Sequence, residues 1–154
     1  MSTDRVSTPL PGPILAIDLG EKRIGLAVSD AGRMIARSYG MFKRTSRQAD
    51  FARYRAVIAE QRVTLVVMGL PLRLDGTDSS TTAWVRHYTA ELAENISVPV
   101  EFWDESYSSQ QAEASLSERG IRAKRQKERL DAAAAAFILQ SYLDAQAEIE
   151  RLRD

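Results

Sequence analysis

The feature that most constrains the fold of this chain is a pair of short apolar runs separated by a tight polar turn. Residues 14–18 read ILAID, residues 24–29 read IGLAVS, and LGEKR connects them. Runs of this length and β-branched content favour buried strands, and so short a connection favours antiparallel pairing. The fold is therefore predicted to begin with a β-hairpin, and a third strand is expected around Met34 to Phe42.

Helix and strand patterns alternate after these strands. Thr45 and Gln48 match a capping box, and the apolar residues that follow recur with helical spacing. Thr64 to Met68 is a β-branched run that stops before Gly69, as a buried strand would. The remaining predicted elements are a helix with Trp84, Val85, Tyr88 and Leu92 on one face, a strand at Val98 to Trp103, a helix opened by Ser108 and closed by Gly120, and a final helix from about Leu130 to Leu152.

This order of elements predicts an α/β fold with a mixed five-stranded sheet. Two strand–helix crossovers add two parallel strands to a three-stranded antiparallel meander, and the helices flank the sheet. A length of 154 residues suits one domain. We expect a single domain over residues 14–154, preceded by a flexible N-terminal leader at residues 1–13.

The composition excludes several classes of protein. The chain has no cysteine, which excludes a disulfide scaffold, a thiol nucleophile and cysteine-bound zinc, and suits the reducing cytoplasm. It shows no signal peptide or membrane span. The 21 basic and 21 acidic residues cancel, so nucleic-acid binding would depend on a local basic groove.

Carboxylates stand at the ends of three predicted elements. Asp18 ends the first strand, Asp104 and Glu105 end the last, and Asp131 opens the final helix. Carboxyl ends of parallel strands and helix N-termini collect at one edge of such a sheet. Taken singly, each acid is more simply a turn, capping or ion-pair residue. Together they predict a site for one or two Mg²⁺ or Mn²⁺ ions, an arrangement suited to phosphodiester hydrolysis.

Three groups of basic residues adjoin these acids: the hairpin turn, the loop from Gly69 to Gly76, and residues 119–129, which hold six basic residues and one acid. Solvated loops are the ordinary interpretation of all three. The functional interpretation is contact with phosphates, with residues 119–129 acting as a flexible arm before Asp131. The candidate nucleic-acid-binding residues are Lys22, Arg23, Arg73, Arg122, Lys124, Arg125 and Lys127.

The histidine and the large aromatic side chains are interpreted as structural. His87 is the only histidine, so neither a histidine metal pair nor a Ser–His–Asp triad can be argued. Trp84 and Tyr88 are predicted by their spacing to pack in the core. Trp103 could stack on a base at the end of the sheet, although burial is favoured.

Four segments carry a resemblance to a known family. DLGEKRIGLA from Asp18 resembles D-x-G-x-K-R-[IV]-G-x-A, and GLPLRLDGT from Gly69 resembles G-[LI]-P-x-x-x-D-G-[ST]. DESYSS from Asp104 is similar to D-E-R-x-[TS]-[TS], and DAAAAAFILQ from Asp131 is similar to a D-x-x-A-A…I-L-Q ending. In this order and spacing, the motifs resemble the YqgF/RuvX family of pre-16S rRNA nucleases over residues 14–143.

The resemblance implies an RNase H-like fold and a nuclease that acts in ribosome biogenesis, at the 5′ end of pre-16S rRNA. It implies a catalytic triad of Asp18, Glu105 and Asp131, with Asp104 as a further or alternative metal ligand. Two positions depart from the family pattern: Ser106 replaces an Arg and Tyr107 an aliphatic residue. An Arg there could stabilise charge on a transferring phosphoryl group, so these changes bear on activity more than on fold.

Other functions stay open at this stage. The family also resembles Holliday junction resolvases, and a cutter of branched DNA would need a homodimer to make symmetric cuts; the sequence does not choose between monomer and homodimer. A non-catalytic RNA-binding module of the same fold is the alternative that Ser106 favours. A phosphotransferase is ranked low, because D-x-G hairpins that hold phosphate in actin-like kinases normally need two related domains.

Overall fold

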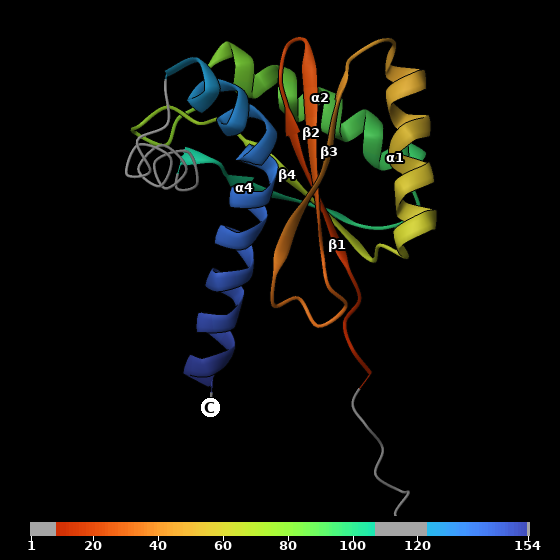
Figure 1. The fold of residues 1–154 in the computed structure, drawn as a ribbon, viewed down its shortest axis with the longest axis vertical. Helices are drawn as coiled ribbons and strands as arrows, with labels where there is room; N and C mark the ends of the chain where they lie inside the picture. Colours follow the sequence, from red (N-terminus) through yellow and green to blue (C-terminus); the bar gives the residue numbers. More distant parts are fainter. Residues whose placement is uncertain (1–8, 107–122, 154) are drawn as a thin grey trace, which may run out of the picture.

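The computed structural model describes residues 9–106 and 123–153, with side chains described for 9–106 and 133–153. The chain forms a five-stranded sheet in the order β3-β2-β1-β4-β5, flanked by helices (Figure 1). The strands are β1 (Ile14–Leu19), β2 (Arg23–Ser29), β3 (Ala36–Lys43), β4 (Leu65–Leu70) and β5 (Val100–Asp104). Within the described residues, the helices are α1 (Arg47–Gln61), α2 (Ser80–Asn95) and α4 (Ala123–Arg153).

The sheet is mixed, as predicted. β1 pairs antiparallel with β2, and β2 with β3. β4 runs parallel to β1 on its other side, and β5 runs parallel to β4. The carboxyl ends of β1, β4 and β5 therefore meet at the same edge of the sheet, which is where this topology places ligand sites.

Successive side chains of β1 alternate between two hydrophobic cores. Leu15 and Ile17 face α1 and α2 in the larger core, whereas Ile14 and Ala16 face α4 in the smaller one. All four side chains are fully buried. A strand covered on both faces needs apolar residues at every position, which explains the continuous run at residues 14–17. Asp18 is the next even-numbered residue and falls on the α4 face.

Two element boundaries differ from the predicted ones for local reasons. β3 begins at Ala36 rather than Met34, because Asp30 accepts hydrogen bonds from the amides of Met34 and Ile35, at 2.8 Å each, and holds them in a turn. α1 is capped by Ser46, whose hydroxyl accepts from the Ala49 amide.

The predicted capping box at Thr45 and Gln48 is therefore wrong: the N-cap is Ser46, one residue later, and its partner Ala49 has no side-chain acceptor to complete a box. The Thr45 amide donates to Asp50 Oδ1 at 3.2 Å. That bond draws Thr45 into the turn before the helix and leaves Ser46 at the capping position.

The final helix begins earlier than predicted. α4 starts at Ala123, so Asp131 lies within it rather than at its first turn. The prediction of a flexible arm up to residue 129 is wrong for residues 123–129. Ala, Lys, Arg, Gln and Glu all have high helix propensity, so the basic run continues the helix. The predicted helix from Ser108 to Gly120 lies outside the described residues.

Candidate active site

Asp18 and Glu105 come together on the α4 face, at the carboxyl ends of β1 and β5. β4 lies between β1 and β5 in the sheet. The register pairs Ile17 of β1 with Met68 of β4, and Trp103 of β5 with Gly69 of β4. Asp18 and Glu105 therefore lie on either side of the carboxyl end of β4. The amide of Glu105 continues the ladder by donating to the Leu70 carbonyl at 3.1 Å. Two acids that are far apart in the chain are thus fixed by backbone pairing rather than by side-chain flexibility.

Gly69 provides the space that the Glu105 carboxylate needs. A Cβ atom at residue 69 would lie 3.0 Å from Glu105 Oε2 and 2.9 Å from Ile138 Cδ1. Such distances are too short for ordinary van der Waals contact, so any side chain there would displace one of the two. Gly69 was quoted from the sequence only as the start of a loop, and its role beneath the carboxylate was missed.

The position of Glu105 in the site changes its pKa. Burial raises the pKa of Glu105 to about 7, and the nearby charges of Asp18 and Asp104 act in the same direction. A hydrogen bond between the carboxyl groups of Glu105 and Asp18 adds to the effect because it requires a proton. Two carboxylates in a half-buried site either share a proton or need a cation between them.

Asp104 takes a different role from Glu105 in the local structure. Its Oδ1 accepts a hydrogen bond of 2.9 Å from the Ser106 amide. By strand alternation it falls on the face opposite Trp103, whose indole donates to Ser141 of α4. Asp104 therefore holds the turn after β5, and its assignment as a metal ligand stays a prediction.

Asp131 lies in α4, four residues before Ala135 and seven before Ile138. Both of those side chains are buried, and Ile138 lies against Gly69. The Asp131 side chain is outside the described part of the chain. Among side chains that are described, no group of three or more Asp, Glu or His is arranged to hold a metal ion, so the role of Asp131 as the third ligand stays a prediction.

An open hollow of about 530 Å³ lies beside Asp18. Its walls are the β1–β2 turn and the neighbouring strands: Asp18, Gly20, Glu21, Lys22, Arg23, Gly25 and Met41. The turn is closed by a 2.9 Å bond from the Gly20 amide to the Arg23 carbonyl. The structure therefore places Lys22 and Arg23 next to the first acid.

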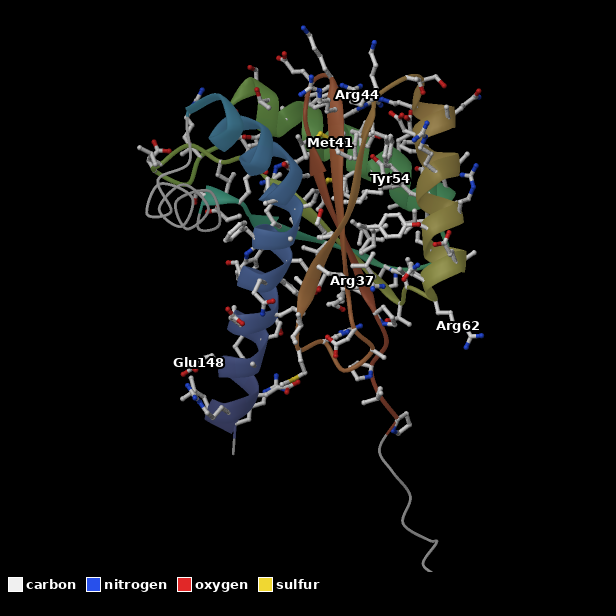
Figure 2. The ribbon with its side chains drawn as sticks, viewed as in Figure 1. Arg37, Met41, Arg44, Tyr54, Arg62 and Glu148 are labelled. Atoms are coloured by element: carbon white, nitrogen blue, oxygen red, sulfur yellow. The ribbon has the colours of Figure 1, made fainter. Side chains whose placement is uncertain are left out.

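Arg44 fixes this turn and was missed in the sequence. Its guanidinium donates to the Glu21 carbonyl at 2.8 Å, and its amide donates to the Lys22 carbonyl at 2.8 Å. Its Nε lies 3.9 Å from the buried carboxylate of Asp50. Figure 2 labels Arg44 at the end of the sheet where the β1–β2 turn lies. Nothing in the local pattern separates this arginine from its neighbours in the sequence, because its partners come from other elements.

Among the other predicted basic residues, Arg73 is the one whose side chain is described, and it is not among the residues that line this hollow. Arg73 is exposed in a compact loop, where its carbonyl accepts from the Gly76 amide and its amide donates to the Thr77 carbonyl. Arg122 lies outside the described residues. Lys124, Arg125 and Lys127 lie in α4, with side chains outside the described part. Their contact with nucleic acid stays a prediction.

The aromatic residues partly follow the sequence prediction. Tyr88 is fully buried and hydrogen-bonded to Tyr54 at 2.9 Å. Trp84 packs on the edge of the same core but also lines a second hollow. Trp103 packs edge-on against Tyr142, and His87 is exposed.

The sheet order and the acid pair at its edge define a protein of the RNase H-like class. Among solved structures, RuvC of T. thermophilus in complex with a Holliday junction substrate is similar, with a TM-score of 0.54 and 18% identity over 88% of this chain and 96% of that one. A fowlpox virus resolvase bound to Holliday junction DNA gives 0.51 and 12% over 87% and 98%. At these identities the likeness shows the fold.

The chain belongs to the RuvX family, described as Holliday junction resolvase, whose model matches residues 12–145. Relatives in Maridesulfovibrio salexigens and Anaeromyxobacter sp. are 41% and 42% identical over 84% of this chain. They are covered to 96% and 95% of their lengths, and each is named "Putative pre-16S rRNA nuclease". In the described part of the chain, no helix combines the length and apolar character needed to cross a membrane.

Proposed function

We propose that this protein is a metal-dependent nuclease that hydrolyses phosphodiester bonds in structured RNA, in processing of the 5′ end of pre-16S rRNA. The observation that carries the proposal is the meeting of Asp18 and Glu105 above Gly69, at the edge where β1, β4 and β5 end. The family model and the names of the relatives support the same reaction class. The acid pair is the core of the proposed site.

The residues at this edge fit a hard divalent cation. Mg²⁺ and Mn²⁺ prefer carboxylate oxygens. A cation between the acids would favour the charged form of Glu105, whose pKa is raised by burial and, in addition, by the charges of Asp18 and Asp104. Asp18 and Glu105 would hold one or two such ions, with Asp131 and Asp104 as further proposed ligands. When bound, these ions supply the charge that activates water and stabilises the leaving oxygen.

The chain itself positions the substrate. Lys22 and Arg23 line the hollow beside Asp18, where they contact the phosphate backbone on either side of the cleaved bond. In this proposal Asp131 would supply the third carboxylate from α4, because its spacing from Ala135 and Ile138 places these positions on one face of the helix. The further proposed phosphate contacts are Arg122, Lys124, Arg125, Lys127 and Arg73.

The decisive experiment is metal-dependent cleavage of a labelled pre-16S rRNA 5′ segment, alongside a four-way DNA junction and a linear DNA duplex. Wild type is expected to cut the RNA with Mg²⁺ or Mn²⁺ and not with EDTA. Asp18→Asn and Glu105→Gln should each abolish hydrolysis while the far-UV circular dichroism spectrum is retained. Both should also weaken Mn²⁺ binding, measured by calorimetry.

Three outcomes would contradict the proposal. Unchanged cleavage by Asp18→Asn in a clean preparation would refute the site. Preferential cutting of the four-way junction would favour the resolvase activity for which the family is described. Tight, salt-sensitive RNA binding without hydrolysis would favour a non-catalytic module, with Ser106 in the place of the family Arg as its physical reason.

The proposed activity also suggests the cellular location and the oligomeric state of the protein. A processor of ribosomal RNA precursors acts in the cytoplasm, where those precursors are made. We propose that residues 14–154 form one nuclease domain, which acts as a monomer or homodimer. A monomer is sufficient for a single cut in RNA, whereas paired cuts in a junction would need two copies.

A further inference from the structure

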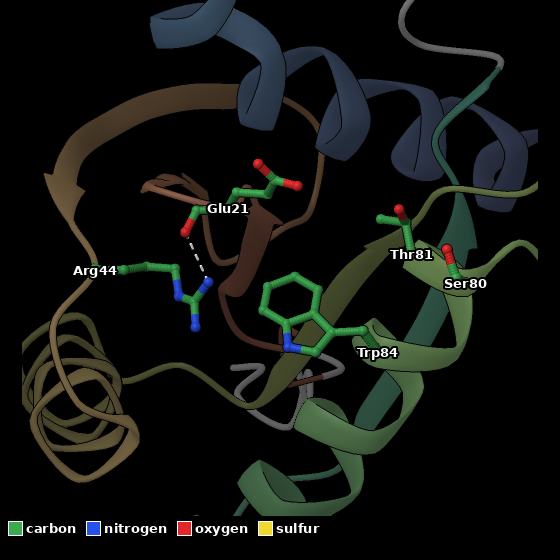
Figure 3. A pocket seen from close by; sticks show the side chains of 5 residues that line it. All are labelled: Glu21, Arg44, Ser80, Thr81 and Trp84. Carbon is green, nitrogen blue, oxygen red and sulfur yellow. Dashed lines mark hydrogen bonds between the residues drawn. The ribbon is translucent and has the colours of Figure 1, made fainter.

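A second hollow of about 310 Å³ lies beside the acidic site and is not used by the proposed hydrolysis. Its lining residues come from the β1–β2 turn, the residue after β3 and the first turns of α2: Glu21, Arg44, Ser80, Thr81 and Trp84 (Figure 3). Glu21 also lines the hollow that contains Asp18. The two hollows therefore adjoin across this residue, and a strand lying over Asp18 can reach both.

The wall of the second hollow is an aromatic and cationic stack. The Arg44 guanidinium carbon lies 4.6 Å from the centre of the Trp84 ring, and Figure 3 shows the two side chains pointing toward one another. Arg44 is also bound to the Glu21 carbonyl at 2.8 Å. This stack is held in place before any ligand arrives, which lowers the entropic cost of binding a flat group against it.

The rim of the hollow offers hydrogen-bonding groups of both kinds. Glu21 is an exposed carboxylate that accepts hydrogen bonds. Ser80 and Thr81 carry hydroxyls that can donate or accept. The capping of α2 is carried by their neighbours, since Ser79 and Thr82 bond each other reciprocally. The rim hydroxyls are therefore not the ones that start the helix.

The combination favours a nucleobase over a phosphate. Glu21 would repel a phosphate in this hollow, whereas it can accept from the amino edge of a base. Trp84 and Arg44 supply the flat surfaces on which unpaired bases stack. A base within a duplex presents neither its face nor its pairing edge, so the hollow suits an unpaired base.

We infer that this hollow is the subsite for an unpaired nucleobase of the RNA strand, adjacent to the phosphodiester that is cleaved. The inference rests on the proposed nuclease function, because the position of the strand over Asp18 sets which base reaches Trp84. It adds that the enzyme distinguishes unpaired from paired RNA through Trp84 and Arg44. Selection of a single-stranded segment is then built into the fold.

The test is tryptophan fluorescence in EDTA, where no cleavage occurs. Trp84 and Trp103 are the only tryptophans, so Trp103→Phe reports on Trp84 alone and Trp84→Phe reports on Trp103 alone. The probes are a short unpaired RNA oligonucleotide of mixed sequence, the same oligonucleotide annealed to its complement, and a matched abasic backbone. The unpaired RNA is expected to quench the Trp103→Phe form, and the other two probes to leave it nearly unchanged.

The affinity of Trp84 variants for the unpaired RNA distinguishes base stacking on the ring from a purely structural role of Trp84. Trp84→Leu removes the ring and should weaken binding of the unpaired RNA by about 5- to 150-fold. Trp84→Phe keeps an aromatic face and should bind within about threefold of wild type. Arg55→Ala is the charge control, because Arg55 bonds the Asn95 carbonyl at the far end of α2; it should leave the quench intact.

Equal quenching by the abasic backbone and the unpaired RNA, or no quenching by any probe, would overturn the inference. If wild type cleaves RNA and Trp84→Leu binds and cuts unpaired RNA as wild type does, the inferred base subsite is refuted. The nuclease proposal is then unaffected. If base-dependent quenching is seen but no preparation hydrolyses RNA, the nuclease proposal fails and a base-binding surface remains.

Discussion

At the scale of single residues, the site depends on one missing side chain. Gly69 leaves room for the Glu105 carboxylate, which a side chain at this position would crowd. Burial raises the pKa of Glu105 to about 7, and the charges of Asp18 and Asp104 act in the same direction. A cation bound beside these acids would favour the charged carboxylate and so offset both effects.

Gly69→Ala should reduce Mg²⁺-dependent RNA cleavage by about 3- to 10-fold, since it would shift the Glu105 carboxylate by less than the ångström-scale misplacement that costs about 100-fold. The added Cβ would contact Glu105 Oε2 and Ile138 Cδ1 and move one of them. Gly40→Ala is the matched control, because a Cβ at residue 40 meets nothing within 4 Å. Equal activity in the two variants would show that the Glu105 carboxylate is not held by this contact.

Glu105→Gln should stabilise the protein at alkaline pH in EDTA. The pKa of Glu105 is raised to about 7 from 4.5, so the folded state binds more protons than the unfolded state between these values. Stability of wild type therefore falls as pH rises through this window. Urea denaturation at about pH 8 should show the variant more stable by about 2–3 kcal/mol, and at about pH 4 the difference should vanish. A pH-independent difference would argue against a raised pKa.

At the scale of elements, the β1–β2 turn is held from outside by the start of α1. Asp50 is buried, and it accepts from the Thr45 amide and from the Tyr88 hydroxyl. Its carboxylate also faces Arg44 at 3.9 Å, and Arg44 bonds the turn that carries Lys22. One buried acid thus links a helix terminus to the mouth of the proposed site.

Asp50→Ala should lower the free energy of unfolding by about 3 kcal/mol, because it leaves the largely buried Arg44 without its acidic partner. Asp50→Asn should cost less, since its amide oxygen can still accept from Thr45. Glu91→Ala is the comparison, as it removes a more exposed pair with Arg47 and should cost no more than about 1 kcal/mol. Equal losses for Asp50→Ala and Glu91→Ala, measured by urea denaturation, would contradict the link through Arg44.

At the scale of the whole molecule, the balance of charges determines how the protein attracts RNA. The net charge is zero, so long-range attraction of RNA is weak and binding depends on the few cations near Asp18. Among the described side chains, Lys22 and Arg23 are the basic ones that line the hollow with Asp18. Each of the two should therefore contribute to RNA binding through a phosphate contact.

Lys22→Ala and Arg23→Ala should each reduce the slope of log K against log salt by about 0.7 for unpaired RNA. Arg55→Ala removes the same charge from α1, where Arg55 bonds the Asn95 carbonyl at the far end of α2. This variant should leave the slope unchanged. The measurement is fluorescence anisotropy of a labelled oligonucleotide across a salt series in EDTA. A uniform effect of all three variants would indicate binding by overall charge rather than by the hollow.

Much of the fold could be predicted because its signals are local. The hairpin at residues 14–29 follows from two apolar runs and a short turn, and both strands form with the predicted pairing. The boundaries at Met34 and Thr45 were wrong because the side chains of Asp30 and Asp50 compete for nearby amides. The predicted start of α4 was wrong because the high helix propensity of residues 123–129 outweighs the repulsion among their basic side chains.

For the site, the sequence supplied the acids but not their neighbours. Asp18 and the pair Asp104 and Glu105 could be singled out because they end strands, and parallel strands end together. The choice of Glu105 from that pair came from the family resemblance. Arg44 could not, because its contacts with Glu21, Trp84 and Asp50 come from three other segments. Trp84 has the spacing of a core residue and packs as one, yet it also lines a hollow that no helical pattern reveals.

By itself, the sequence determined the order of strands and helices, the mixed sheet and the family, because hydrophobic period, turn length and motif spacing are properties of neighbouring residues. The tertiary structure alone decided that Gly69 makes room for Glu105, that Arg44 fixes the turn beside Asp18, and that Trp84 faces a hollow. Those facts depend on distances between segments remote in the chain. Such distances are set only when the two cores pack against the sheet.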